Sequence, residues 1–584
     1  MSGVGTVGGL KGLDRNQAAI MDREFRTMLA QISNGMSPLE LTLATLDWIS
    51  HLSISPGKQV HLTQSFYRKL GKLAVYSLRS IVKKDLDGPS SGIERRMSGE
   101  DWQRWPFNVL AHAHQVGKDW WQEAATGVEG VREEHQIMVH AAADQILDLL
   151  SPANYPLTNP EVLKTTWKER GRNLGRGLKF FVKDQIRDAF NNGFEENAAA
   201  FRVGENLAIT PGKVVFQNAL IELIQYEPVT KQVGAEPVLI TPAWIMKYYI
   251  LDLSPKNSLV KYLTEQGKTV FIVSWKNPDR EDKHVSFEDY VELGIMAAIG
   301  AVSDICPKHK IHAVGYCIGG TLLSIAAAAM ARDDDDRLQS ISLFAAQTDF
   351  SEAGEITRFI SASQLSFLEK LMWKRGYLGS ENMGGAFSAL RSSDLIYAGM
   401  VDRYFLGKDV VLNDLMSWNA DGTRMPYQMH KEYLEQLYLN NELARNRFKV
   451  AGRVVSMSDV KTPMFILGTE TDHVAPWKSV YKILDLTNNE ATFALTSGGH
   501  NAGVVSGPQH PRRRYRINTR SIGQKYQDPD SWMEDQDIHQ GSWWPAWDAW
   551  LDSAMSGKKA PPAMGAPRKG LKPLRSAPGE YVFG

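Results

Sequence analysis

Cys317 is the residue in this 584-residue chain whose type and setting most clearly indicate chemistry. It lies in the segment Val314-Gly315-Tyr316-Cys317-Ile318-Gly319-Gly320, between a predicted strand over 311–316 and a predicted helix over 318–331. This setting is typical of a nucleophile elbow, where glycines permit a sharp turn that raises the nucleophile above the sheet edge. A helix N-terminus also favours a negative charge such as a thiolate. We therefore predict that Cys317 is a covalent nucleophile for acyl transfer.

A proton acceptor and an acid follow Cys317 in the order that α/β-hydrolases use. Asp472 follows a predicted strand over 464–467, and His500 follows the next one, over 492–495, on a loop flanked by glycine. Parallel strands bring such loops to one edge of the sheet. We predict that His500 takes the proton of Cys317, while Asp472 orients the imidazole or acts on the substrate.

Three neighbouring residues compete for these roles. Asp349, after a predicted strand over 341–345, and Glu470 are alternative acids. His473 adjoins Asp472 and is a candidate for contact with substrate, although His500 has the loop expected of the base.

Other motifs lack the setting that their chemistry requires. Ser90 lies in a Gly-x-Ser-x-Gly pattern, but a charged segment rather than a strand precedes it. Cys306, His309 and His312 have ligand-like spacing without an evident fourth ligand. Phosphate-loop, dinucleotide and haem motifs are absent from the sequence. We predict neither a metal nor a bound cofactor.

The composition of the chain limits which partners and which cellular compartment we expect. The formal net charge is zero, so no overall basic field attracts nucleic acid. Only two cysteines occur, which fits a reducing compartment. Apolar stretches are too short to span a bilayer, and the N-terminus has no pattern of a signal peptide. These features predict a cytoplasmic protein without a transmembrane segment.

The chain divides into a helical part and an alternating part. Residues 1–200 carry helical patterns over 18–29, 65–78 and 134–150, with a polar loop over 83–99. Beyond residue 200, strands and helices alternate as in a parallel sheet. The predicted strands are 214–216, 220–226, 238–240, 269–275, 311–316, 341–345, 464–467 and 492–495, and the predicted helices are 258–266, 287–305, 318–331 and 477–484.

Residues 351–452 interrupt this alternation with helical patterns rich in Met, Leu, Tyr and Trp. An insertion at this place should lie over the sheet edge as a cap. We therefore predict an α/β-hydrolase fold over 201–584 with a helical cap insertion, preceded by a mostly helical N-terminal domain over 1–200.

From about residue 100 to its end, the chain resembles the polyhydroxyalkanoate synthases, most closely the class I enzymes. The elbow alone would indicate only the hydrolase superfamily, but several further segments make the resemblance specific. They are Lys247–Leu253, Val273–Pro278, Gly315–Gly320, Trp418-Asn419, Asp472–Trp477, Gly499-His500 and Gly541–Pro545.

The resemblance implies both an activity and a place of action. The family polymerises (R)-3-hydroxyacyl-CoA into polyester and releases CoA, so CoA arrives with the substrate. Cys317, Asp472 and His500 match its catalytic Cys, Asp and His. The resemblance further implies a homodimer at the surface of cytoplasmic polymer granules. It assigns granule association and dimerisation to the helical N-terminal part, and places Trp418 in a cap region tied to dimerisation.

One departure concerns the loop that follows the strand over 238–240. Met246 stands where the family commonly has Asn. This loop should supply one oxyanion donor, the backbone N–H of Ile245, while Ile318 supplies the other. A backbone donor survives a change of side chain, so the reaction is better defined than the substrate preference. Met246, Trp418 and His473 are the candidates for substrate binding.

Two other interpretations remain beside the polymerase. A Cys-dependent hydrolase of the same fold, a thioesterase or polyester depolymerase, would release free hydroxy acid. A granule-coating protein would use the aromatic surface segments. The elbow and its two partner loops argue against a coat, which would not need them.

Overall fold

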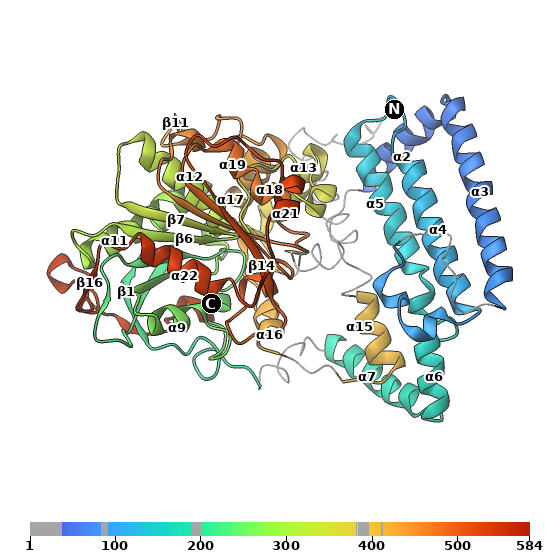
Figure 1. The fold of residues 1–584 in the computed structure, drawn as a ribbon, viewed down its shortest axis with the longest axis horizontal. Coiled ribbons are helices and arrows are strands. Elements are labelled where there is room, and N and C mark those ends of the chain that lie inside the picture. The colour runs from blue at the N-terminus through green and yellow to red at the C-terminus, as the bar shows by residue number, and fades with distance from the viewer. Residues whose placement is uncertain (1–37, 83–91, 190–199, 381, 384–395, 410–412) are drawn as a thin grey trace, which may run out of the picture.

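The computed structural model describes residues 38–82, 92–189, 200–380, 382–383, 396–409 and 413–584. The predicted helix over 18–29 and Ser90 lie outside these residues. Figure 1 shows a helical unit beside a larger unit built on a sheet. None of the helices in the described ranges is long and apolar enough to cross a membrane.

The helical unit consists of helices that pack along one another. The helices are α2 (Pro38–Ser53), α3 (Pro56–Ser80), α4 (Phe107–Ala125), α5 (Glu133–Leu149), α6 (Pro160–Lys168) and α7 (Arg172–Ala189). The predicted helices over 65–78 and 134–150 are confirmed within α3 and α5. Proline is the first residue of three of the helices, where a missing N–H costs nothing.

An eleven-stranded sheet forms the centre of the larger unit. Its middle strands are parallel and buried on both faces, and the outer strands are antiparallel. In spatial order the strands are β15 (His539–Gln540), β14 (Arg514–Arg520), β13 (Ala491–Thr496), β12 (Met464–Thr469), β7 (Leu338–Phe344), β6 (Ile311–Tyr316), β4 (Val238–Thr241), β5 (Val270–Trp275), β2 (Ile221–Tyr226), β1 (Gly212–Gln217) and β17 (Arg575–Ser576).

Helices α9 (Leu259–Glu265), α12 (Ile318–Arg332) and α22 (Trp544–Ser553) accompany this sheet. The predicted alternation of strands and helices is thereby confirmed. Two helices differ. The helix expected over 477–484 is divided into α18 (Trp477–Tyr481) and α19 (Ile483–Leu486), and the continuous helix expected over 287–305 contains a π-helical stretch at Tyr290–Met296. There Gly294 faces the Trp275 ring, and a Cβ would come within 2.7 Å of it. The widened turn and the missing side chain together accommodate the indole.

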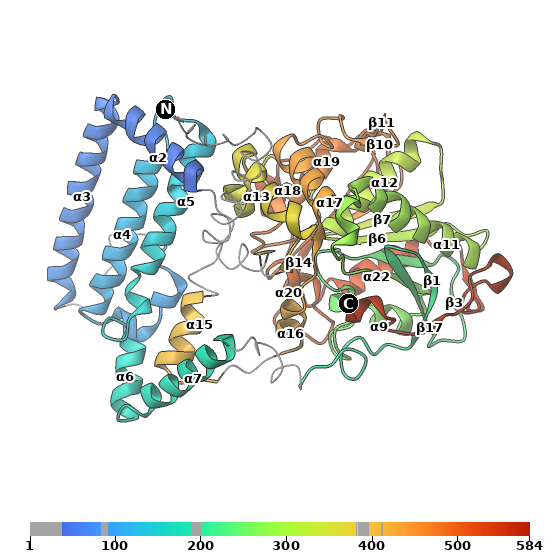
Figure 2. The ribbon, with the colours of Figure 1, turned by 180° about the vertical axis from the view of Figure 1, so that it is seen from behind.

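The insertion between β7 and β12 contains several short helices. Most of it lies against the sheet unit, with α13 (Ala362–Arg375), α16 (Asp414–Ala420), α17 (Tyr427–Glu432) and the π-helical η10 (Tyr433–Leu439). A different part, α15 (Ala398–Met400) followed by η9 (Val401–Phe405), packs against α7 of the helical unit (Figure 2). The insertion therefore touches both units.

The contact between α7 and η9 is close and charged. Arg403 donates two hydrogen bonds to the buried Asp184 carboxylate, at 2.6 and 3.0 Å, and Tyr404 donates a third at 3.1 Å. The backbone of Tyr404 lies so near Gly177 that a Cβ there would overlap its carbonyl. Val162 of α6 packs with Val401 beside this pair.

Replacing Asp184 by Ala should lower the free energy of unfolding of the helical unit by about 3 kcal/mol, because Arg403 loses its buried partner. Chemical denaturation followed by circular dichroism measures this. The matched control is Asp101→Ala, which breaks an ion pair to the exposed Lys164 and should cost at most about 1 kcal/mol. Equal losses in both variants would contradict a special role for the Asp184 contact.

Candidate active site

The turn between β6 and α12 holds Cys317 in a strained backbone conformation. Its φ is 55° and its ψ is −129°, a region that non-glycine residues rarely adopt, at a cost of about 1–3 kcal/mol. The Cys317 N–H donates to the Phe344 carbonyl of β7 at 2.8 Å. A Cβ on Gly315 would overlap Gly320 across the turn. The predicted elbow is therefore present, and its glycines permit the close crossing of strand and helix.

Gly319 brings the loop after β4 against the elbow. A Cβ at this position would lie 2.5 Å from the Pro242 carbonyl oxygen and would also overlap that of Thr241. Trp275 donates to the same Pro242 carbonyl at 2.9 Å from the other side. The loop that contains Ile245 is thus held between the elbow and β5.

Gly319→Ala should lower kcat about 100-fold, because the added methyl group must displace the loop predicted to carry an oxyanion donor. Steady-state CoA release measures this loss. Gly300→Ala on helix α11 (Ala297–Ile305) is the control, since a Cβ there meets no atom within 4 Å. A Gly319→Ala enzyme with unchanged kcat would contradict the expectation.

Asp472 and His500 meet where β12 and β13 end. The His500 Nδ1 lies 2.7 Å from Asp472 Oδ2. That oxygen also accepts from the Thr469 hydroxyl at 3.0 Å. The other carboxylate oxygen accepts the N–H groups of Val474 and Ala475, each at 2.9 Å. The carboxylate is therefore fixed in place and holds one orientation of the imidazole.

Neighbouring charges shift the pKa values of His500 and Asp472 in opposite directions. Burial alone would lower the pKa of His500, but the Asp472 carboxylate and Cys317 together raise it well above its ordinary value of 6.5. Burial would raise the pKa of Asp472, yet the charge and hydrogen bond of His500, with two backbone N–H groups, hold it below 3.8. The structure thus brings all three predicted residues together.

The short helix α20 (His500–Val504) is held from its C-terminal end. Its last carbonyls accept N–H groups from Trp543 and Trp544, each at 3.0 Å, and from Arg513 at 2.6 Å. Both indoles are at most 1% exposed. These indoles therefore fill the core and fix the helix that begins with His500.

Three tyrosines that the sequence did not single out surround the group. The Tyr316 ring packs on His500 with 5.6 Å between centroids, and its hydroxyl donates to Asn501 at 2.5 Å. Tyr433 of the insertion is buried and Tyr438 is partly buried, and the nearby Cys317 adds to the burial that raises the pKa of both. Cys317 itself is 8% exposed. Helical spacing in the insertion gave no signal that these rings would cover the thiol.

The loop that contains Ile245 is hydrogen-bonded to the insertion. Met246 pairs with Gly422, and the Trp418 indole donates to the Lys247 carbonyl at 2.7 Å. Trp418 is 3% exposed, so its ring is part of the core. The oxyanion roles of Ile245 and Ile318, and the substrate roles of Met246 and Trp418, remain predictions.

The alternative acids have other partners. Asp349 accepts from the Ser351 backbone at 2.8 Å and from the Asn441 amide at 3.0 Å. Glu470 accepts from Arg514 at 2.9 Å. His473 is half-buried in the turn after Asp472, and its role remains a prediction. His312, from the weaker ligand-like pattern, lies 2.7 Å from the Ser340 hydroxyl.

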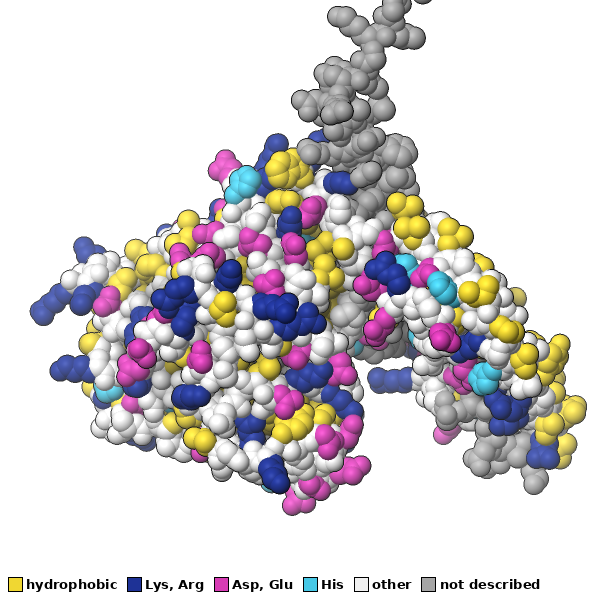
Figure 3. Space-filling model, turned by 90° about the horizontal axis from the view of Figure 1, so that it is seen from above, with side chains coloured by type: hydrophobic (Ala, Val, Ile, Leu, Met, Phe, Trp, Pro, Cys, Tyr) yellow, Lys and Arg dark blue, Asp and Glu magenta, His cyan; other side chains and the backbone are white. Residues whose placement is uncertain are grey.

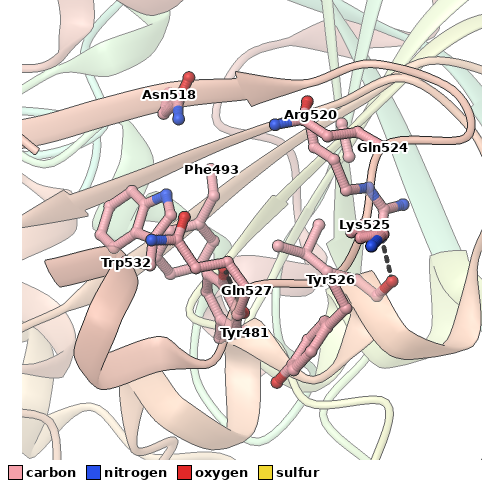
Figure 4. Close-up of a pocket in the computed structure, with 11 residues that line it drawn as sticks. Tyr481, Phe493, Asn518, Arg520, Gln524, Lys525, Tyr526, Gln527 and Trp532 are labelled. Carbon is pink, nitrogen blue, oxygen red and sulfur yellow. Dashed lines mark hydrogen bonds between the residues drawn. The ribbon is translucent and has the colours of Figure 1, made fainter. Parts of the chain in front are cut away.

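A separate hollow lies at the opposite end of β13 from His500. Tyr481, Trp532 and Arg520 line it, as Figure 4 shows. Its volume is about 20 Å³, room for a single water molecule. The Arg520 guanidinium donates to the Thr487 carbonyl at 2.9 Å, so it stabilises the backbone beside the hollow.

Comparison with known sequence families gives three matches. Residues 16–58 match "Poly-beta-hydroxybutyrate polymerase N terminal", and residues 93–263 match "Poly-beta-hydroxybutyrate polymerase (PhaC) N-terminus". Residues 236–506 match the "alpha/beta hydrolase fold". The last match covers the elbow and both partner loops, and it confirms the predicted fold class.

Similar proteins cover nearly the whole chain. It is 35% identical to "Poly(3-hydroxyalkanoate) polymerase subunit PhaC" of Rhizobium meliloti (strain 1021), over 97% of this chain and 92% of the relative. It is 35% identical to "Poly(3-hydroxyalkanoate) polymerase" of Methylorubrum extorquens, over 93% and 89%. Among solved structures, a monoacylglycerol lipase of Paleococcus ferrophilus is 14% identical, with a TM-score of 0.31, over 55% of this chain and 97% of the lipase.

Proposed function

The chain belongs to the poly(3-hydroxyalkanoate) polymerase family, and from this premise we propose that it joins (R)-3-hydroxyacyl units from CoA thioesters through an acyl group carried on Cys317. The observation that carries the proposal is that Cys317, in its strained elbow, lies near enough to the His500–Asp472 pair to raise the pKa of His500. The reaction is an acyl transfer, and CoA is its released product.

Acylation uses the thiol and the imidazole. His500 accepts the Cys317 proton, and the thiolate attacks the thioester carbonyl. The backbone N–H groups of Ile318 and Ile245 stabilise the oxyanion. The bond to the CoA sulfur then breaks, and the proton on His500 passes to the leaving thiolate. Thioester exchange between two sulfurs is close to balanced in energy, which suits a cysteine nucleophile.

Chain growth requires a hydroxyl nucleophile. The 3-hydroxyl of one unit attacks the acyl thioester of another, an ester bond forms, and the thiolate leaves. The hydroxyl proton passes to His500, which Asp472 holds in position. The Asp472 carboxylate already accepts hydrogen bonds from Thr469, Val474 and Ala475. We therefore favour this orienting role over direct deprotonation of the substrate hydroxyl by Asp472.

Exclusion of water distinguishes a polymerase from a hydrolase. The insertion places Tyr433 and Tyr438 near Cys317, which is only 8% exposed. Such a cover protects the acyl group from hydrolysis, and substrate reaches the thiol only when the cover shifts.

We also propose that the protein acts as a homodimer on the surface of cytoplasmic polymer granules. Figure 3 shows hydrophobic side chains along the outer edge of the helical unit. Helix α3 exposes Tyr67 and Leu78, which are 66% and 70% exposed. An apolar face of this extent fits a polyester surface. Co-sedimentation with washed granules tests the association, and light scattering in solution tests the dimer.

The experiment that tests the function supplies 3-hydroxyacyl-CoAs of several chain lengths to the purified protein and follows CoA and polymer together. A polymerase gives CoA with polymer. Release of CoA with free hydroxy acid and without polymer would instead establish the thioesterase alternative. That result would overturn the proposal.

A further inference from the structure

We propose that Thr423, a residue of the insertion, is a positioning residue for the oxyanion donor of Ile245. This inference rests on the proposed function, because it assigns to Thr423 the orientation of one group that the acyl transfer uses. It concerns a residue more than 170 positions along the chain from the loop that it orients.

Thr423 bonds to two consecutive carbonyls of the loop. Its hydroxyl donates to the Trp244 carbonyl at 2.7 Å, and its backbone N–H donates to the Ile245 carbonyl at 3.3 Å. Thr423 and Trp244 are each 1% exposed, so water cannot replace the hydroxyl. Two adjacent peptide groups are therefore fixed by one residue.

Fixing a carbonyl fixes the N–H of the same peptide group. The Trp244 carbonyl and the Ile245 N–H belong to one planar, trans peptide, so they point in opposite directions. With the carbonyl turned to Thr423, the Ile245 N–H faces away from the insertion residue that holds it. Within the described ranges, this N–H donates to no protein atom.

The loop lies beside the nucleophile. Gly319, two residues after Cys317, contacts the carbonyls of Thr241 and Pro242 at the start of this loop. The Trp244 ring lies 6.5 Å from that of Tyr433, whose hydroxyl lies close enough to Cys317 for the thiol to raise its pKa in addition to burial. An N–H available on this loop is therefore close to where the oxyanion forms.

Neighbouring contacts hold Thr423 itself in place. The Arg424 N–H donates to Asn277 at 2.9 Å, and Tyr249 donates to Asp421 at 3.0 Å. With the Trp418 bond to Lys247, these contacts flank Thr423 on both sides. The insertion thus forms one support of the oxyanion site as well as its cover.

The test compares Thr423→Val with Thr423→Ser. Valine keeps the shape without the hydroxyl, and we expect kcat for CoA release to fall about 100-fold with KM changed less than about threefold, as for a misaligned oxyanion donor. Serine keeps the donor and should retain kcat within about threefold. Rapid-mixing measurement of the first CoA released shows whether acylation itself slows.

Thr264→Val is the matched control. Thr264 is also 1% exposed, and its hydroxyl donates to a backbone carbonyl, that of Lys261, at 2.9 Å on α9. This variant should keep the wild-type kcat. If Thr423→Val does not fold, Thr423→Ala and Thr423→Ser make the same comparison, since only serine carries the hydroxyl.

An unchanged kcat in the hydroxyl-free variant, or an equal loss in the serine variant, would overturn the inference. Failure of the proposed function has a different signature, because CoA release would then persist when Cys317 is removed. Loss of activity in Cys317→Ala together with full activity in Thr423→Val would remove the role of Thr423 alone.

Discussion

Cys317→Ala is expected to lower the rate of CoA release from 3-hydroxyacyl-CoA by at least about 10⁴-fold, because no other group can carry the acyl chain. The remaining elements of the site would still bind substrate, so affinity for the CoA thioester should change little. With substrate labelled in its acyl part, wild-type protein should retain label after denaturation, and the variant should retain none.

The second cysteine provides the control. Cys306 is 1% exposed, at the end of α11, and burial raises the pKa of its thiol to about 11. Cys306→Ala should therefore leave turnover and labelling unchanged. Retained turnover in Cys317→Ala would remove the covalent scheme, and loss of label in Cys306→Ala would place the acyl group elsewhere.

Asp472→Asn is expected to lower kcat by about 10⁴-fold, as loss of the orienting carboxylate does in related triads. An amide can turn its NH₂ toward His500 Nδ1 and stabilise the wrong tautomer. The variant should also lack the negative charge that raises the pKa of His500, leaving burial to lower it. The acid limb of the CoA-release profile, where His500 loses its proton and becomes able to accept that of Cys317, should therefore move to lower pH.

Asp349→Asn is the matched control for this change, because Asp349 is the other acid that the sequence offered near this edge. Its carboxylate accepts from Ser351 and Asn441, so its loss should leave the pH profile in place. If the pH profile of Asp472→Asn has the same shape and midpoints as that of the wild type, whatever the size of kcat, the coupling to His500 is excluded.

The same pair gives stability a pH dependence. The raised pKa of His500 contributes stability that is complete below 6.5 and is lost as pH rises through the raised value. The lowered pKa of Asp472 contributes stability present above 3.8 and lost as pH falls through the lowered value. The difference in melting temperature between wild type and Asp472→Asn should therefore be largest between these two limits and shrink at alkaline pH.

The elements around the nucleophile could be predicted because local signals agreed. An apolar strand, glycines on both sides of Cys317 and a helix after it are encoded within one short segment. The loops of Asp472 and His500 follow apolar strands in the same way. Chain order then sufficed to predict His500 as the base, but it left open whether Asp472 orients the imidazole or acts on the substrate.

Contacts that depend on packing could not be predicted in this way. Thr423 reaches Trp244 across 179 residues, and no periodicity in the insertion indicates that meeting. The role of the Trp543 and Trp544 indoles could not be predicted, because sequence does not show that their N–H groups donate to the carbonyls at the end of α20. The widening of the helix near Gly294 likewise depends on a ring from a different strand.

The small core shared by Val162 and Val401 has a consequence for synthesis on the ribosome. Chains are made from the N-terminus, so α7 emerges long before η9, and Asp184 precedes its partner Arg403 by 219 residues. During that interval the apolar surface of α6 and α7 lacks its cover. Translation of the insertion, rather than of the helical segment itself, therefore completes the helical unit.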